Sequence, residues 1–363
     1  MKILFVFAHP APYKIDLFNG LAPHVELTVV FERHASGFRH PYFYDRTHYA
    51  FKTIFLRGIS FGAENHYSRE LIRHLKKNDY DLIVMNGYSS LTEIVTINYL
   101  QRTHRPYVLY VNGGVVRKDP PWRKRLKTRL ISRAAHYFAP APQVDDYLIH
   151  YGANPALIVR YPYATLFHKD LSRELIGKDQ RITFWKRLGI PRDNVFLSAG
   201  QFVSRKNNTL LLSLWAKRSP DDHLVLVGSG PEEAKYRRFI EDNDLHNVHL
   251  IGYQRHEDLL NFMAHAEAFI ILSKEDIYGH VVNESLSQGT PVIGSSRVIA
   301  ARHLIKDGYN GFVVDPENEN GINQAIDQIQ GQDTRRGCLD TAAQFTIETM
   351  VAQHLAAFQN LVK

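Results

Sequence analysis

The sequence predicts an α/β protein built from two doubly wound, Rossmann-like domains. Short apolar runs alternate with helix-like stretches along the chain, and strands that are apolar on both faces are typical of a parallel sheet covered by helices. The chain has 363 residues, which is more than one hydrophobic core usually organises. Two such domains are therefore expected.

The alternation is clearest in the carboxy-terminal half. The expected strands there are Val195–Ala199, His223–Val227, Val248–Ile251, Ala268–Leu272, Pro291–Ile293 and Gly311–Val314. Each is followed by a helix-like stretch, which starts near Asn208, Pro231, His256, Val281, Ala300 or Gly321. One strand and one helix in about 20–28 residues is the repeat expected of βαβ units.

The amino-terminal half repeats this pattern less regularly. Its expected strands are Lys2–Ala8, Val25–Phe31, Asp81–Asn86, Tyr107–Val111 and His136–Ala139. Between the halves, Arg160–Asp193 is charged, contains two prolines and shows no clear strand, which indicates a linker followed by a helix. The two domains are accordingly expected at residues 1–164 and 165–346.

Composition excludes several classes of protein. The single cysteine, Cys338, cannot form an internal disulfide or a cysteine-based zinc site, which fits a reducing compartment. The first apolar run is too short for a signal peptide and no run approaches about 18 apolar residues, so a cytoplasmic protein is expected. The net charge of +7 attracts anions, whether nucleotide phosphates, acidic lipid or nucleic acid.

Ligands of open parallel sheets bind beyond the carboxyl ends of the strands. The turn Gly228–Gly230 directly follows an expected strand, but Glu233 stands where a dinucleotide site needs a third small residue. A glycine turn with Pro231 at the first helical position is favoured instead.

After the strand ending at Leu272, Asp276 and Glu284 flank the start of a helix, where backbone N–H groups attract phosphate. Two carboxylates there suit a nucleotide sugar, and a simple helix cap is the alternative.

The segment from 273 to 293 resembles the E-x7-E signature of the retaining family 4 glycosyltransferases, which have the GT-B fold. The residues in register with that signature are Ser273, Tyr278, Gly279, Glu284, Gly289, Pro291, Val292 and Ile293. Asp276 replaces the first glutamate, and its side chain is one methylene shorter, so either the sugar contact is expected to move or a different sugar is expected to bind. The loop Ser198–Asn208 is similar to the family's G-R-L-x-x-x-K-G loop, whose Arg and Lys clamp the donor diphosphate. Lys206 matches the Lys, whereas Gln201 stands in place of the Arg; a solvated basic turn is the alternative.

The resemblance implies a role for each matched residue. Lys206, Asp276 and Glu284 are the expected catalytic residues: they act on the diphosphate, the sugar hydroxyls and the ribose hydroxyls, respectively. The other residues expected to contact the donor are Gly200, Gln201, Arg205, Tyr253, Gln254, Gly279, His280 and Val281. The resemblance implies no metal ion and no cofactor, and the 19 histidines show no metal-ligand spacing.

The first domain resembles the family by architecture, and the resemblance implies that it binds the acceptor. Tyr13 and Lys14 lie in a segment similar to a P-x-Y-K-x-x-x-F pattern on the acceptor side; a plain helix start is the alternative. Asn112 and Gly113 follow an expected strand, with Asn112 in register with a family histidine. The terminal helix 347–363 is expected to pack back on this domain.

Two further segments leave alternatives open. Residues 121–133 place Trp122, Leu126 and Leu130 four residues apart among many cations. Such a helix can lie on anionic lipid, or bury its apolar stripe against its own domain; nucleic-acid binding is disfavoured because no known motif accompanies the charge. The aromatic segment Pro41–Phe51 forms either a platform for sugars or a small loop core.

We therefore expect a retaining, metal-independent glycosyltransferase. It would move a sugar from a nucleotide diphosphate donor, with UDP favoured, to a hydroxyl of a glycan or lipid-linked acceptor in polysaccharide or glycolipid synthesis. It would be cytoplasmic, with peripheral contact at the inner face of the membrane. The alternatives are a nucleotide-sugar epimerase of the same fold, and a nucleotide-sugar-binding scaffold that has lost activity through Gln201, Asp276 and Asn112.

Overall fold

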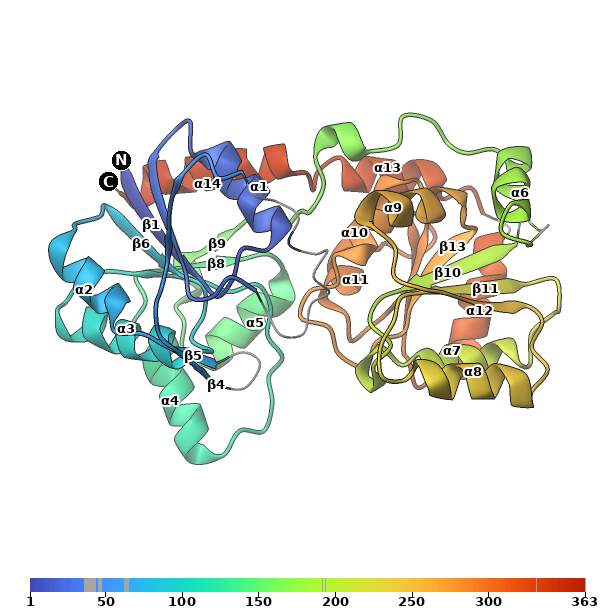
Figure 1. The fold of residues 1–363 in the computed structure, drawn as a ribbon, viewed down its shortest axis with the longest axis horizontal. Helices are drawn as coiled ribbons and strands as arrows, with labels where there is room; N and C mark the ends of the chain where they lie inside the picture. The colour runs from blue at the N-terminus through green and yellow to red at the C-terminus, as the bar shows by residue number, and fades with distance from the viewer. Residues whose placement is uncertain are drawn as a thin grey trace. The chain divides into compact units, whose positions relative to one another are not determined.

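The computed structural model describes residues 1–35, 44, 48–61, 65–190, 192, 194–330 and 332–362. The chain forms two compact units (Figure 1). Unit 1 contains Met1–Thr165 and Thr346–Lys363, and unit 2 contains Leu166–Phe345. These breaks lie one residue from the expected limits at 164 and 346.

Unit 1 is built on a seven-stranded parallel sheet of order β3-β2-β1-β6-β7-β8-β9. Its strands are β1 (Lys2–Phe7), β2 (Glu26–Phe31), β3 (Lys52–Phe55), β6 (Leu82–Met85), β7 (Val108–Tyr110), β8 (His136–Ala139) and β9 (Ile158–Arg160). The strand order reverses at β1, because β2 lies on one side of it and β6 on the other. A short antiparallel hairpin, β4 (Ile59–Phe61) and β5 (Asn65–Tyr67), stands apart from the sheet.

The helices of unit 1 cover the sheet. They are α1 (Pro12–Leu21), α2 (Glu70–Lys77), α3 (Leu91–Arg102), α4 (Pro121–Ile131), α5 (Pro142–His150) and the terminal α14 (Ile347–Leu361). Helix α14 packs beside α1 (Figure 1). The approach is close, because a Cβ on Gly20 would lie 2.6 Å from a methyl group of Val351. The ring of Phe358 also lies edge-on to that of Phe5, with centroids 6.1 Å apart, so the last helix completes the core of unit 1.

Unit 2 has a six-stranded parallel sheet of order β12-β11-β10-β13-β14-β15. Its strands are β10 (Val195–Ala199), β11 (His223–Val227), β12 (Val248–Ile251), β13 (Ala268–Ile271), β14 (Val292–Ser295) and β15 (Gly311–Val314). Its helices are α6 (Lys178–Lys186), α7 (Asn208–Trp215), α8 (Glu233–Asp242), α9 (His256–His265), α10 (Val281–Ser287), α11 (Ile299–Leu304), α12 (Glu319–Gln330) and α13 (Arg335–Ala342). The strand order reverses between β10 and β13.

Both sheets confirm the predicted fold class of two doubly wound α/β domains. The strands are apolar on both faces because helices cover both faces. Phe196, Leu224 and Ile270 are buried on one face with Trp215 of α7 and Ile326 of α12, and the adjacent residues Leu197 and Val225, on the other face, are also fully buried. Burial of such surfaces drives folding of each unit.

Three features of the fold differ from the sequence-based expectation. The edge strands β3 and β9 and the β4–β5 hairpin were not expected, because they are short and at most partly buried and so lack a continuous apolar run. Helix α8 begins at Glu233 rather than at Pro231, because the backbone N–H of Glu232 bonds to the carbonyl of Phe202 in a preceding turn. Of the aromatic segment 41–51, residues 41–43 and 45–47 lie outside the described residues, while Tyr49 and Phe51 pack against each other.

None of the helices formed by the described residues has both the length and the apolar character that crossing a bilayer requires.

Candidate functional site

The loops that follow β10 and β13 bring together two of the three expected catalytic residues, Lys206 and Asp276. Neighbouring strands on either side of a reversal in strand order leave room for ligand at their carboxyl ends. Here the ammonium group of Lys206 contacts the carboxylate of Asp276 directly, and Arg205 Nη1 lies 3.8 Å from the other Asp276 oxygen. The side chains of Lys206 and Asp276 are largely buried. Two cations therefore face one carboxylate, which leaves a positive charge beside the strand ends.

Local backbone contacts hold these two loops in register. Asn207 adopts a left-handed conformation with φ of +60°, and its side-chain amide donates to the carbonyl of Leu272 over 3.2 Å. The N–H of Lys274 donates to the carbonyl of Arg205 over 2.8 Å. Because asparagine tolerates this conformation better than most residues, the turn after Lys206 is fixed without glycine.

The loop that carries Asp276 is anchored to the start of α11. Asp276 forms a backbone bridge with Val298, and the N–H of Ala300 donates to the carbonyl of Tyr278 over 2.8 Å. Gly279 has φ of +97°, and a Cβ there would lie 2.6 Å from a methyl group of Val298, so the position requires glycine. Burial raises the pKa of the Tyr278 hydroxyl, and the aromatic ring fixes the loop from inside.

Glu284 lies in α10 and is only 7% exposed. Its carboxylate is 3.4 Å from Nε2 of His256, the first residue of α9. His256 was not among the expected site residues, because only the folded chain brings it to Glu284. The nearby Ser273 is buried, and its hydroxyl has no hydrogen-bond partner among the described residues.

The glycines after β11 serve a close backbone approach. A Cβ on Gly228 would lie 1.9 Å from the carbonyl oxygen of Gly200, and one on Gly230 would lie 2.5 Å from that of Phe202. The turn therefore packs against the loop that leads to Lys206, in agreement with the glycine turn favoured from the sequence.

The remaining expected donor residues occupy neighbouring loops of unit 2. Gln201 is half-buried after β10, and its carbonyl accepts from Val203. His280 precedes the first residue of α10, Val281. Tyr253 is exposed after the edge strand β12, and the Gln254 amide bonds to the carbonyl of Gly252 over 3.3 Å.

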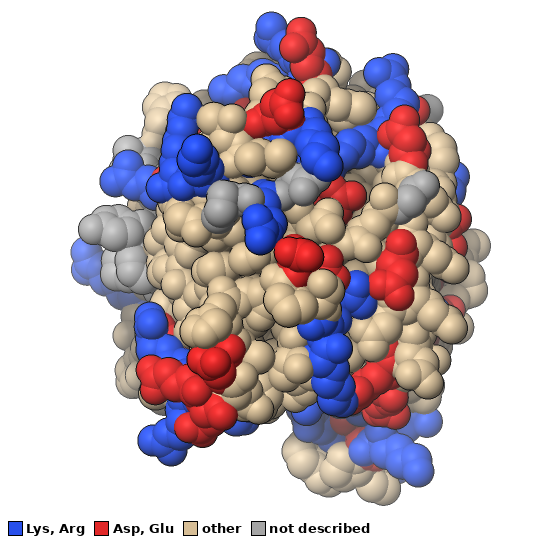
Figure 2. All heavy atoms as spheres, turned by 90° about the vertical axis from the view of Figure 1, so that its right-hand side faces the viewer, with Lys and Arg blue, Asp and Glu red and all other residues tan. Residues whose placement is uncertain are grey.

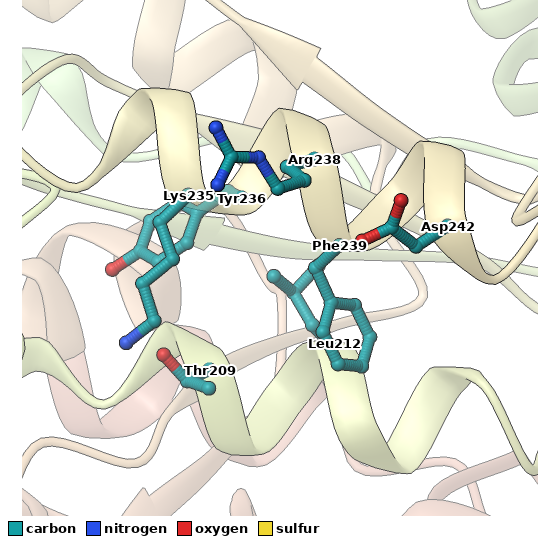
Figure 3. A pocket seen from close by; sticks show the side chains of 7 residues that line it. All are labelled: Thr209, Leu212, Lys235, Tyr236, Arg238, Phe239 and Asp242. Carbon is teal, nitrogen blue, oxygen red and sulfur yellow. The ribbon is translucent and has the colours of Figure 1, made fainter.

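A surface hollow of about 190 Å³ lies elsewhere, between α7 and α8. Figure 3 shows Thr209 and Leu212 of α7 facing Tyr236 and Phe239 of α8 across it, while Arg238 points away. Tyr236 touches the loop that leads to Lys206 from behind, with its ring centroid 5.3 Å from that of Phe202, but the residues that line the hollow include neither Lys206 nor Asp276.

In unit 1, the expected acceptor residues surround a buried lysine. Lys14, which was expected on the acceptor side, is buried, and its Nζ donates to Oδ1 of Asn112 over 3.1 Å. Burial holds the pKa of Lys14 well below the usual range. Tyr13 is half-buried, and its ring lies 5.8 Å from that of Tyr163. Gly113 is half-buried beside Asn112.

Two family models match successive parts of the chain. Residues 180–344 match the model described as glycosyl transferases group 1, and residues 14–162 match the one described as glycosyltransferase family 4. Two doubly wound units, each matched by one of these models, define a glycosyltransferase of the GT-B class. The chain belongs to glycosyltransferase family 4.

Named relatives and solved structures agree with this assignment. The lipopolysaccharide core biosynthesis glycosyltransferase LpsE of Rhizobium meliloti is 34% identical over 169 residues, which are 46% of this chain and 48% of LpsE. The N-acetylgalactosamine-N,N'-diacetylbacillosaminyl-diphospho-undecaprenol 4-alpha-N-acetylgalactosaminyltransferase of Campylobacter jejuni is 28% identical over 146 residues, 40% of each chain. This chain thus spans about half the length of the curated relatives it matches, or less. The structure of Anabaena HepE in complex with UDP has a similar fold, with a TM-score of 0.79 at 18% identity over 99% of this chain and 100% of HepE.

Proposed function

We propose that this chain transfers a sugar from a nucleotide diphosphate donor, with UDP as the favoured nucleotide, to a hydroxyl group of an acceptor. The observation that carries the proposal is the meeting of Lys206 and Arg205 with Asp276 where the strand order of unit 2 reverses. Cations at this edge suit a diphosphate, and a carboxylate beside them suits sugar hydroxyls. The UDP complex of HepE supports the choice of nucleotide.

In this proposal the protein stabilises the leaving group rather than supplying a base. Lys206, with the backbone amides of Gly279–Val281, binds the diphosphate and balances the charge that grows as its bond to the sugar C1 breaks. The acceptor oxygen forms the new bond to C1 on the same face, and its proton passes to the departing diphosphate oxygen. The configuration at C1 is therefore retained, and no metal ion takes part.

Asp276 and Glu284 orient the donor. Asp276 accepts hydrogen bonds from the sugar hydroxyls, and its contact with Lys206 holds that cation beside the strand ends. Glu284 accepts from the ribose hydroxyls, with His256 holding the carboxylate from α9. The base of the nucleotide lies near Tyr253 and Gln254.

The acceptor is proposed to be a glycan or a lipid-linked sugar. Names of the relatives support this, because one refers to lipopolysaccharide core synthesis and another to a diphospho-undecaprenol substrate. Such acceptors belong to polysaccharide or glycolipid synthesis, and a lipid anchor would place the reaction at the inner face of the cell membrane.

Helix α4 is the proposed membrane contact. Trp122 is 69% exposed and Leu126 is also exposed, whereas Leu130 and Ile131 at the end of the helix are buried. The apolar stripe is thus divided between the surface and the core. Lys124, Arg125, Arg129 and Arg133 line a hollow of about 530 Å³ along the helix, which suits lipid phosphates. By contrast, the face in Figure 2 shows cations and anions interspersed. Exposed Trp and clustered cations on one helix are typical of contact with anionic lipid.

The experiment that tests the function is transfer from a radiolabelled UDP-sugar panel, compared between the parent chain and Lys206→Ala. Loss of one phosphate-stabilising donor is expected to lower the turnover number about a hundredfold. Lys217→Ala is the matched control, because Lys217 is an exposed lysine of unit 2 that pairs with Glu319. If Lys206→Ala transfers sugar as fast as the control, the assigned site is wrong. The product anomer, read by NMR, must match the donor; inversion would contradict the retaining reaction.

A further inference from the structure

The buried amine of Lys14 is the centre of a hydrogen-bonded chain in unit 1. Its Nζ donates to the Tyr110 hydroxyl over 3.3 Å and to Asn112 Oδ1 over 3.1 Å. Its other surroundings are aromatic, since Nζ lies 4.3 Å from the ring centroids of both Tyr110 and Tyr163. Within the described part of the chain, no carboxylate pairs with this lysine. The hydrogen bonds of Lys14 therefore go to uncharged side chains, and they orient those side chains.

His354 of α14 determines which groups donate and which accept on the Tyr110 side of this hydrogen-bonded series. Its Nδ1 lies 2.7 Å from the carbonyl of Met350, which can only accept, so Nδ1 carries the proton. The Tyr110 hydroxyl, 3.2 Å from Nε2, must then donate to it. Burial lowers the pKa of His354 to about 3, which keeps the ring neutral. The oxygen of Tyr110 is left to accept from Lys14.

On the side of Lys14 away from Tyr110, hydrogen bonds orient the side-chain amides of Asn112 and Asn86. Asn112 Oδ1 accepts from Lys14 and from the Tyr161 hydroxyl, at 3.1 and 3.2 Å. Asn112 Nδ2 then donates to Asn86 Oδ1 over 2.8 Å. This contact occupies the oxygen of Asn86 and leaves its Nδ2 as a donor that no described protein atom accepts from.

Asn86 stands at the edge where a parallel sheet binds ligands. It follows β6 directly, and its backbone N–H donates to the carbonyl of Val6 in β1 over 3.0 Å. The strand order of unit 1 reverses between these two strands, which is the usual place for a ligand. The space beside Asn86 is open, because a Cβ on Gly87 would meet no described atom within 4 Å. Asn86 itself is only half-buried.

We propose that Asn86 and Asn112 form a sugar-binding pair in unit 1, in which Asn86 Nδ2 donates a hydrogen bond to a ring hydroxyl of the carbohydrate and Lys14 is a positioning residue that holds Asn112. The choice of carbohydrate as ligand rests on the proposed glycosyl transfer. The Asn86 N–H donor is oriented before the ligand arrives, since the contacts of Lys14 and Tyr161 fix the Asn112 amide that holds Asn86. A sugar that lacks the contacted hydroxyl leaves the amide unpaired and is discriminated against.

Side-chain amide NMR tests the pair directly. The full chain is labelled with 15N-asparagine and titrated with the methyl glycosides of glucose, galactose and N-acetylglucosamine. The signals of Asn86 and Asn112 are identified by their loss in Asn86→Ala and Asn112→Ala. Both signals are expected to shift with at least one glycoside, and Asn86→Ala is expected to weaken that binding about threefold to tenfold. Asn98→Ala is the matched control, because among the described residues the Asn98 amide bonds to the Ile94 carbonyl of its own helix and to no other group.

Lys14→Met tests the positioning role. Methionine has a similar length and suits the aromatic surroundings, so the unfolding temperature is expected to hold while the Asn112 signal shifts and glycoside binding weakens. A merely structural lysine would change the unfolding temperature without weakening binding. Tyr161→Phe, which keeps the ring and removes the hydroxyl that donates to Asn112, gives the same comparison if Lys14→Met does not fold.

Binding of UDP, measured by calorimetry, separates this inference from the proposed function. If UDP binds the parent chain but not Lys206→Ala, and no glycoside shifts the Asn86 signal, the sugar-binding pair is refuted while the donor site stands. Glycoside binding that is equal in Asn86→Ala and the parent chain refutes it as well. Absence of nucleotide binding contradicts the proposed function instead.

Discussion

The hydroxyl of Ser90 donates a hydrogen bond of 2.6 Å to the buried carboxyl group of Glu32, while the backbone N–H of Ser90 donates to Glu93 over 3.1 Å. One serine at the start of α3 thus joins two buried acids. Burial raises the pKa of Glu32 to about 7 and that of Glu93 to about 8, where the charge of Glu32 adds to the effect. The pair holds a proton near neutral pH.

This pair predicts that unfolding becomes easier as the pH rises. Both pKa values in the folded chain lie above the 4.5 of a free glutamate, so the folded state binds protons more tightly. Its advantage is complete below about pH 4.5 and is lost as the pH passes through 7 and 8. Urea unfolding between about pH 5 and 9 should show a progressive loss of stability, at about 1.4 kcal/mol per pH unit for each acid while only its folded form holds the proton. Glu32→Gln should flatten this slope, whereas Glu26→Gln at an exposed position should not; equal slopes would refute the assignment.

Asp276→Asn is expected to separate nucleotide binding from sugar transfer. The amide oxygen of the variant can still accept from Lys206 and hold it in place but carries no negative charge, so the affinity for UDP should stay equal or rise about threefold. Transfer should fall about tenfold, because an acceptor for the sugar hydroxyls is weakened. Asp276→Glu, which installs the residue usual in the family, should retain transfer. Calorimetry measures the affinity for UDP, and the transfer assay measures the rate. If both fall together in Asp276→Asn, Asp276 does not act on the sugar separately from the nucleotide.

Gly279→Ala is expected to destabilise the chain by about 2 kcal/mol, because alanine is strained at this φ and its Cβ would overlap Val298. Thermal unfolding measures the loss. Gly252→Ala is the control, since a Cβ there meets no atom within 4 Å. A similar unfolding temperature for both variants would show that the loop before α10 is not held by this contact.

The rate of sugar transfer is expected to be unchanged when a chelator removes metal ions. The proposed mechanism gives charge stabilisation to Lys206 and backbone amides, so the turnover number in excess EDTA should equal that in added magnesium or manganese. Activity that is lost with EDTA and returns with one of these ions would show that a metal takes part. Consumption of donor without acceptor, followed by chromatography of the nucleotide sugar, would indicate an epimerase.

Replacement of Arg123, Lys124 and Arg125 by glutamate should abolish flotation with anionic liposomes, because three cations of α4 are reversed. Trp122→Ala should weaken binding to these vesicles through the loss of an exposed apolar group. Reversal of Lys235, Arg237 and Arg238 on α8 is the matched control. Unchanged flotation of the α4 variant would remove the membrane contact from the proposal.

Sequence periodicity predicted the sheets well where strands are buried on both faces. The limits of β10, β11, β12 and β15 are those expected, because their apolar runs end at polar or glycine residues. The edge strand β3 and the hairpin were missed, because strands open to solvent need no such run.

Prediction of the site was limited by contacts between distant residues. Asp276 and Glu284 were expected from a single segment with a fixed spacing. His256 beside Glu284, and Asn86 beside Asn112, depend on which strands are neighbours, which a single sequence does not reveal. Lys14 was expected on the acceptor side, and its burial could not be read from the sequence because lysines are mostly exposed; the fold provides two oxygen acceptors and aromatic rings that allow it.

The return of α14 to unit 1 sets an order for folding during synthesis. Phe358 and His354 complete a core whose other members, Phe5 and Tyr110, leave the ribosome much earlier. Unit 2 is continuous and can fold as soon as it emerges, whereas unit 1 is complete only once α14 has been made. Until then Phe5 and Tyr110 lack their packing partners from α14, so unit 1 becomes native after unit 2 has been synthesised.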